Sequence, residues 1–333
     1  MTVAASGRLG PFIVCVQGVS LTSREREVLA HPWVGGVIYF TRNFESKDQI
    51  RGLSQEIHGI PRPVGCPPLL ICIDHEGGRV QRFRDGFTEI PAMSTLGAMW
   101  DVNDVDAQLA ALARARQLGY VLATELREVG IDFSFTPVLD LDWGRSEIIG
   151  ERAFHHDPRV VSQLSAALMH GLSLAGMKNC GKHFPGHGWS QADSHLALPI
   201  DERPLEEILH QDVLPYARIG SPALSSVMPA HIRYTQVDDA PAGFSKIWLA
   251  HILRQRLGFE GVIISDDLSM AGAAVLDDVA DRAEAAFIAG CDATLICNRP
   301  DLVERALDEL PKRMPGFLHD PARRGLELLR PLS

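Results

Sequence analysis

Residues 69–82 read LLICIDHEGGRVQR, a run of five apolar side chains followed directly by a dense group of polar ones. Five residues suffice for one strand but are too few for a helix of ordinary length. The run does not alternate between apolar and polar residues, which indicates a strand buried on both faces, as in parallel sheets. The polar residues that follow would then lie at the carboxyl end of that strand.

The same pattern recurs along the chain, with longer amphipathic segments between the apolar runs. Residues Val105–Val129 form the clearest of these segments, because apolar side chains recur three and four positions apart. Strands are expected at Phe12–Val16, Gly36–Phe40, Leu69–Ile73, Phe133–Pro137, Met177–Gly181, Ser225–Met228, Val262–Ser265 and Ala293–Cys297. Helices are expected at Val105–Val129, Arg159–Leu174, Leu205–Arg218, Ile247–Leu257, Asp278–Ala289 and Leu302–Leu310.

Eight strands that alternate with helices predict an α/β protein whose parallel sheet closes as a (β/α)8 TIM-type barrel. We expect residues 1–333 to form a single catalytic domain with a peripheral C-terminal tail from about residue 311. A doubly wound open sheet is the alternative. It has less support, because no Gly-x-Gly-x-x-Gly follows the first strand and no Gly-x-x-x-x-Gly-Lys-Ser/Thr occurs.

The composition limits the classes of partner. The 333 residues include 42 acidic and 32 basic side chains, and the net charge of −10 disfavours nucleic-acid binding and suits a small-molecule substrate. Six cysteines without a Cys-x-x-Cys pair are expected to be reduced thiols rather than zinc ligands or disulfides. Without a recognisable signal peptide or an 18-residue apolar run, we expect no membrane span and a cytoplasmic location.

Polar groups follow four of the expected strands, at 74–82, 182–195, 229–231 and 265–270. In a parallel barrel the carboxyl ends of all strands open onto one face, so these groups are expected to line a single pocket. The pocket would be rich in hydrogen-bond donors, which suits sugar hydroxyls, phosphate or carboxylate. The donors are Arg82, Arg152, Lys182 and His183.

Two acidic elements are candidates for the chemistry. Asp266 and Asp267 are adjacent at the end of a strand, so their side chains point to opposite sides and at most one enters the pocket. Asp193 lies two residues before His195 and could fix the tautomer of that imidazole and raise its basicity. Two glycines shortly before this element suggest a mobile loop.

These residue types leave the class of hydrolase open. His183, His187, His195 and Asp266 could be the ligands of a metal-dependent hydrolase. A carboxylate and an imidazole could equally provide the nucleophile and the acid/base without a metal. No His-x-His pair follows the first strand, which disfavours the metal.

Four strings resemble glycoside hydrolase family 3: IDHEGGRVQR at 73–82, KHFPGHG at 182–188 with DSH at 193–195, MPAH at 228–231, and ISDDLSM at 264–270. Within that family they look like the single-domain bacterial β-N-acetylglucosaminidases of peptidoglycan recycling, and the resemblance extends from about residue 12 to 300. KHFPGHG followed by Asp-x-His is a highly specific signature, and ISDDLSM supports it.

The resemblance implies a retaining double displacement. Asp266 would attack the anomeric carbon and form a covalent glycosyl-enzyme. His195, held by Asp193, would protonate the leaving oxygen and then deprotonate the attacking water. These steps need no metal and no other cofactor.

The resemblance also assigns substrate binding to five residues: Asp74, Arg82, Arg152, Lys182 and His183. Asp74 would accept hydroxyl protons from the non-reducing N-acetylglucosamine, and Arg82 would flank the same ring. Ala153 stands where the family often has Ser or Thr, which removes one local hydrogen bond.

The implied substrate is GlcNAc-1,6-anhydro-MurNAc, with or without its peptide, and the expected state is a monomer or weak homodimer. Two alternatives remain: another β-glycosidase of the same family, such as a β-glucosidase, and a sugar-binding barrel without turnover. The presence of Asp266, Asp193 and His195 disfavours the second alternative.

Overall fold

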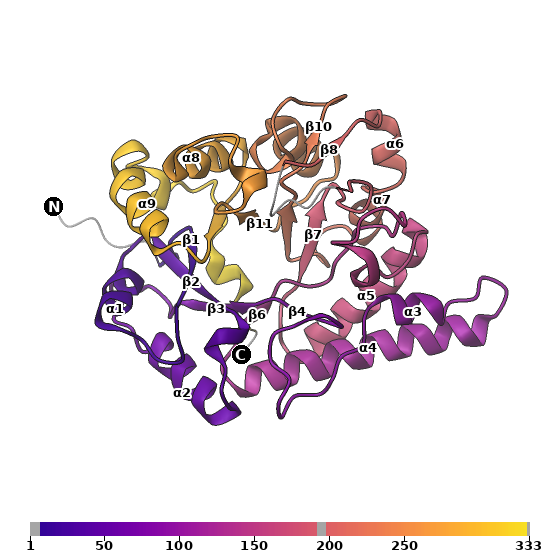
Figure 1. Cartoon of the computed structure of the whole chain (residues 1–333), viewed down its shortest axis with the longest axis horizontal. Helices are drawn as coiled ribbons and strands as arrows, with labels where there is room; N and C mark the ends of the chain where they lie inside the picture. Colours follow the sequence, from indigo (N-terminus) through magenta and orange to yellow (C-terminus); the bar gives the residue numbers. More distant parts are fainter. Residues whose placement is uncertain (1–6, 192–197, 332–333) are drawn as a thin grey trace.

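The computed structural model describes residues 7–191 and 198–331, and within them eight parallel strands form a barrel (Figure 1). In order around the barrel they are β1 (Phe12–Cys15), β2 (Val34–Tyr39), β3 (Leu70–Ile73), β6 (Phe133–Ser134), β7 (Cys180–Phe184), β9 (Ser226–Pro229), β11 (Val262–Asp267) and β12 (Ala293–Ile296). The barrel closes between β6 and β7, where Cys180 N–H donates to the Thr136 carbonyl at 2.8 Å and Leu139 N–H to the Lys182 carbonyl at 2.7 Å. The predicted (β/α)8 barrel is therefore confirmed.

Helices surround the barrel and connect its strands (Figure 1). They are α1 (Ser23–Ala30), α2 (Lys47–His58), α3 (Ser94–Ala98), α4 (Val105–Glu128), α5 (Pro158–Leu174), α6 (Leu205–His210), α7 (Leu214–Ile219), the π-helix η4 (Ile247–Arg256), α8 (Val279–Ala289) and α9 (Pro300–Arg313). Two small sheets lie in the connections: β4 (His75–Gly77) pairs with β5 (Val80–Gln81), and β8 (Ile200–Asp201) pairs with β10 (Arg233–Tyr234).

The strands separate two apolar clusters, one inside the barrel and one between the barrel and its helices. Neighbouring residues of a strand alternate between them: Ile13 and Ile264 belong to the inner cluster, whereas Phe12 and Ile263 belong to the outer one. This alternation is the two-residue period of a strand. Because both faces are buried, the strands read as uninterrupted apolar runs.

Some predicted elements differ from the structure. The strand expected at Met177–Gly181 is β7, which runs from Cys180 to Phe184 and so contains Lys182 and His183. The helix expected at Leu205–Arg218 is divided into α6 and α7, because Asp212 is buried between them and Pro215 starts the first turn of a new helix. Helices α1 and α2 were not predicted, although Thr22 and Glu25 form a capping box at the start of α1.

The chain beyond residue 311 contributes to the core. The expected boundary falls inside α9, which continues to Arg313. Further on, Leu326 and Leu329 are fully buried and belong to the inner cluster, and their segment contacts both β3 and β11. Arg330 donates to the carbonyl of Pro68, just before β3, at 2.8 Å. This segment therefore covers the amino-terminal end of the barrel, opposite the end where the polar motifs lie.

Two other expectations concern membrane spans and the cysteines. Among the described residues, no helix is long and apolar enough to cross a bilayer. Four of the six cysteines are buried thiols, as predicted: Cys72, Cys180, Cys291 and Cys297.

The C-terminal cover gives a matched pair of variants. Leu326→Ala should lower the free energy of unfolding by roughly 2–5 kcal/mol, since it leaves a cavity in the inner cluster. Leu328→Ala should change it by less than about 0.5 kcal/mol, because Leu328 is 56% exposed. Denaturant unfolding of both variants tests this. An equally small change in the free energy of unfolding for both variants would mean that the segment is peripheral.

Candidate active site

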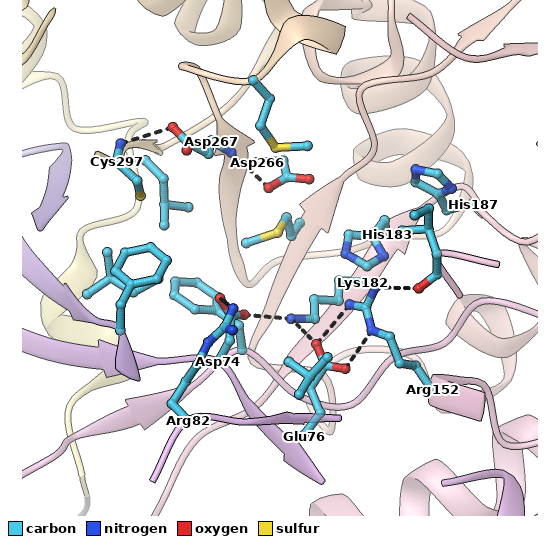
Figure 2. Close-up of a pocket in the computed structure, with 18 of the residues that line it drawn as sticks. Asp74, Glu76, Arg82, Arg152, Lys182, His183, His187, Asp266, Asp267 and Cys297 are labelled. Atoms are coloured by element: carbon cyan, nitrogen blue, oxygen red, sulfur yellow. Dashed lines mark hydrogen bonds and ion pairs between the residues drawn. The ribbon is translucent and has the colours of Figure 1, made fainter. Parts of the chain in front are cut away.

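A cavity of ≈ 230 Å³ opens at the carboxyl ends of the barrel strands. The structure brings eight of the residues singled out from the sequence to its wall: Asp74, Arg82, Arg152, Lys182, His183, His187, Asp266 and Asp267. They come from β7, β11 and the connections that follow β3, β6 and β7, which explains how distant motifs form one site (Figure 2). Asp193 and His195 lie outside the described residues.

The floor of the cavity is a chain of paired charges (Figure 2). The Lys182 ammonium lies 2.8 Å from Asp74 Oδ1 and 2.6 Å from Glu76 Oε1. Arg152 binds the same Glu76 carboxylate with two donors, Nε at 2.8 Å from Oε2 and Nη2 at 2.9 Å from Oε1. Glu76 was not among the binding residues expected from the sequence, although it lies in the string IDHEGG.

Mutual pairing keeps these groups charged. Burial alone would raise the pKa of Glu76, but the charges of Arg152 and Lys182 outweigh it and hold that pKa well below its usual range. Burial would likewise lower the pKa of Lys182, yet Asp74 and Glu76 raise it. Removing one member would leave another as an uncompensated buried charge, which is far costlier than the pair itself.

Asp74 and Arg82 form the more open part of the wall. Arg82 Nη2 lies 3.7 Å from Asp74 Oδ2, and its guanidinium sits 5.6 Å from the centre of the Phe40 ring. Both side chains are partly exposed to the cavity. A carboxylate beside a guanidinium offers acceptors and donors to adjacent hydroxyl groups, which suits a sugar ring.

The two aspartates at the end of β11 diverge (Figure 2). Asp267 accepts hydrogen bonds from Ser269 N–H at 2.9 Å, Ser269 O–H at 2.7 Å and Cys297 N–H at 3.0 Å. Burial raises the pKa of Asp267, and these hydrogen bonds oppose the increase. Asp266 Oδ1 accepts from Asp267 N–H at 2.8 Å, and its carboxylate faces the cavity. Asp267 thus holds the backbone, while the Asp266 carboxylate lies at the cavity wall.

A carboxylate that sequence reasoning missed organises the histidine motif. Asp140, fully buried, accepts from the backbone N–H of His183 at 3.1 Å and of His187 at 2.7 Å, and its Oδ2 lies 2.7 Å from His183 Nδ1. Burial would raise the pKa of Asp140, but these contacts lower it. Its signal was the string PVLDLD at 137–142, an aspartate directly after an apolar run.

The two glycines of the same motif, Gly186 and Gly188, lie where a side chain would not fit. A Cβ on Gly186 would meet Asp212 Cβ at 2.6 Å, and one on Gly188 would meet the Leu141 carbonyl oxygen at 1.8 Å. Both glycines are buried. They allow close packing of the backbone. The mobility expected of the loop that carries Asp193 and His195 concerns residues outside the described ranges and stays a prediction.

His231 of the MPAH string is fully buried, with Nε2 3.2 Å from the Asp267 carbonyl oxygen, so it supports the end of β11. In the ranges 7–191 and 198–331, no three His, Cys, Asp or Glu side chains are grouped as metal ligands. His195, one ligand of the metal-dependent alternative, lies outside those ranges.

Comparison with known proteins agrees with this geometry. The sequence model of the glycosyl hydrolase family 3 N-terminal domain matches residues 12–318. A beta-hexosaminidase of Bordetella avium is 56% identical over 308 residues, which are 92% of this chain and 86% of that protein. Native NagZ from Neisseria gonorrhoeae has a TM-score of 0.88 at 47% identity, over 98% of this chain and 91% of that one. The same NagZ in complex with N-trifluoroacetyl-D-glucosamine has a TM-score of 0.87, at the same identity and coverage.

The match to the family extends over most of the barrel and includes every strand that contributes to the cavity. The chain therefore belongs to glycosyl hydrolase family 3 and is a glycoside hydrolase. Within that family it is similar to the beta-hexosaminidases of the NagZ type.

His187 gives this site a measurable pH dependence of stability. Burial and the neighbouring His183 lower the pKa of His187 from 6.5 to about 4. Between these values the unfolded chain binds a proton that the folded chain does not, so the free energy of unfolding falls as the pH falls. His187→Asn should reduce this fall by up to about 3 kcal/mol between pH 7 and pH 4. Denaturant unfolding at several pH values tests this, and an unchanged pH dependence would contradict it.

Proposed function

We propose that this glycoside hydrolase is an exo-β-N-acetylglucosaminidase. Its proposed substrate is GlcNAc-1,6-anhydro-MurNAc, with or without peptide, and its setting is the recycling of peptidoglycan in the cytoplasm. The beta-hexosaminidases at 50–56% identity support the class of sugar. The complex of the related NagZ with N-trifluoroacetyl-D-glucosamine supports a 2-acylamino group in that sugar.

The observation that carries this proposal is the Asp266 carboxylate, which faces a wall of sugar-binding charges across one small cavity. The volume of ≈ 230 Å³ is below the roughly 300–1,000 Å³ of pockets for drug-sized ligands, which suits one sugar ring and hence an exo-acting enzyme. Asp74, Lys182 and Arg82 would hold the ring by its hydroxyls. Their charges are already paired, so binding requires little rearrangement.

The proposed reaction has two steps. Asp266 attacks the anomeric carbon, and the bond to the leaving sugar breaks as His195 gives its proton to the leaving oxygen. Neutral His195 then removes a proton from water, which attacks the anomeric carbon and releases Asp266. Asp193 orients His195 in both steps. The fixed position of Asp266 Oδ1, which accepts from Asp267 N–H, supports the first step.

Substrate choice tests the class of sugar. Nitrophenyl N-acetyl-β-D-glucosaminide should be hydrolysed with a kcat/KM at least about 10²-fold above that of nitrophenyl β-D-glucoside, because a site built around an amide rejects a ligand that lacks it. GlcNAc-1,6-anhydro-MurNAc should release N-acetylglucosamine equally with and without a chelator. A preference for the glucoside would favour a β-glucosidase, and chelator-sensitive activity restored by zinc would favour the metal-dependent alternative.

The two aspartates of β11 form a matched pair. Asp266→Asn should lower kcat by roughly 10⁴-fold or more, since it removes the nucleophile, while leaving the free energy of unfolding nearly unchanged. Asp267→Asn should mainly lower the free energy of unfolding, by about 1–3 kcal/mol, because it disturbs three accepted hydrogen bonds. Steady-state kinetics and unfolding of both variants separate the roles. The reverse pattern would exchange the two assignments.

A further inference from the structure

Beside the active site lies a second group of buried charges, which we call the stem cluster: Trp143, Trp189, Asp201, Arg203 and Asp212. Arg203 binds Asp201 Oδ2 through Nη2 at 2.6 Å and Asp212 Oδ2 through Nη1 at 2.8 Å. Trp143 Nε1 donates to Asp212 Oδ1 at 3.1 Å. The Arg203 guanidinium also stacks on both indoles, 5.1 Å from the Trp143 ring and 4.5 Å from the Trp189 ring.

Burial of three charges is weak evidence that they serve stability. Arg203 is 5% exposed, and Asp201 and Asp212 are 1% exposed each, so three charges have lost almost all contact with water. Such groups are often replaceable by apolar residues at no cost in stability. Burial raises the pKa of Asp212 to about 6 even though Arg203 opposes it, so the ionised carboxylate is destabilised where it lies. The arrangement instead fixes directions, because a bidentate guanidinium accepts partners only in its plane.

The stem cluster contacts the chain on both sides of residues 192–197. Before them, the backbone of Gly186 packs on Asp212, and the carbonyl of Gly186 accepts from Tyr234 O–H at 2.8 Å. Trp189, three residues further on, contacts Arg203 and Trp143.

After residues 192–197, the chain enters β8, whose pairing with β10 ends at Asp201. Arg203 N–H and Nε both donate to Asp201 Oδ1, at 3.0 and 3.1 Å. One guanidinium therefore contacts both stems of the segment: Trp189 on the first and Asp201 on the second.

We propose that Arg203 and the stem cluster are positioning residues for the acid/base step, because they hold the two stems of the segment that carries Asp193 and His195. The inference rests on the proposed function of His195. It assigns Arg203 no contact with the sugar, since Arg203 does not line the cavity.

This role has a kinetic signature that a purely structural role lacks. Proton donation matters when the leaving alcohol is basic, as in a disaccharide, and matters little for dinitrophenolate. Displaced stems would move His195 relative to the glycosidic oxygen, and a shift of about 1 Å can cost roughly 10²-fold in rate. Loss of the stem cluster should therefore slow cleavage of disaccharides selectively.

The experiment compares kcat/KM for GlcNAc-1,6-anhydro-MurNAc and for dinitrophenyl N-acetyl-β-D-glucosaminide. Arg203→Met should lower the first by roughly 10²-fold and the second by less than about threefold. Arg203→Lys, which keeps the charge, should recover part of the loss. His195→Ala, measured alongside, should show the same selectivity with a larger effect.

Arg254→Met is the matched control. Arg254 makes an equally short ion pair, 2.6 Å to Asp292, and donates to the carbonyls of Phe259 and Gly261 at the amino-terminal end of the barrel. It should lower the midpoint of thermal unfolding without changing the ratio of the two kcat/KM values. Trp143→Phe removes only the indole donor to Asp212 and provides a milder variant if Arg203→Met does not fold.

The outcomes distinguish a failure of the positioning role of Arg203 from a failure of the acid/base assignment of His195. Selective loss in His195→Ala but equal losses on both substrates in Arg203→Met and Trp143→Phe would overturn the positioning role alone. Equal losses on both substrates in His195→Ala would overturn the acid/base assignment on which it rests. A selective loss in Arg254→Met as well would mean that any destabilisation produces the signature, which also overturns the inference.

Discussion

The Lys182 ammonium lies between two carboxylates, Asp74 and Glu76, and the rest of the site depends on this arrangement. Lys182 belongs to β7 and the carboxylates to the connection that leaves β3, so the contact joins strands that are separated by β6 around the barrel. Arg152 completes the chain of charges from a third segment. Removing any one of these charges would leave a neighbouring charge without its partner, which is costly in a buried site. The three segments therefore hold one another in place. The sugar-binding wall is therefore formed before any ligand arrives.

The opposite wall is fixed through backbone contacts. The carboxylate of Asp267 accepts a hydrogen bond from the turn after β11, and His231 contacts the carbonyl of the same residue. These contacts fix the backbone next to Asp266, whose carboxylate faces the cavity. Asp140 does the same for the motif after β7, where it binds two backbone N–H groups. In each case a buried polar side chain fixes the main chain beside a residue that faces the ligand. This division suits a hydrolase, since reacting groups must be held within a fraction of an ångström.

The sequence predicted the barrel because buried parallel strands leave short, uninterrupted apolar runs, and it predicted the cavity because polar motifs follow those runs. It misplaced β7, since hydrophobicity alone does not show that the charge of Lys182 is neutralised by Asp74, 108 positions away. The same limit hid Asp140 and Glu76, whose partners come from other connections. Nor did it show that Gly186 packs against Asp212, because this is a tertiary contact.

The central claim is that Asp266 is the nucleophile of a retaining glycosidase, and a trapped intermediate tests it most directly. The enzyme would be incubated with a 5-fluoro N-acetylglucosaminyl fluoride, digested, and its labelled peptide sequenced by mass spectrometry. A mechanism-based fluoro sugar forms the glycosyl-enzyme faster than water can remove it, so the account predicts one sugar on Asp266 and none in Asp266→Asn. A label on Asp267, or turnover of the fluoride with inverted configuration and no label, would contradict it.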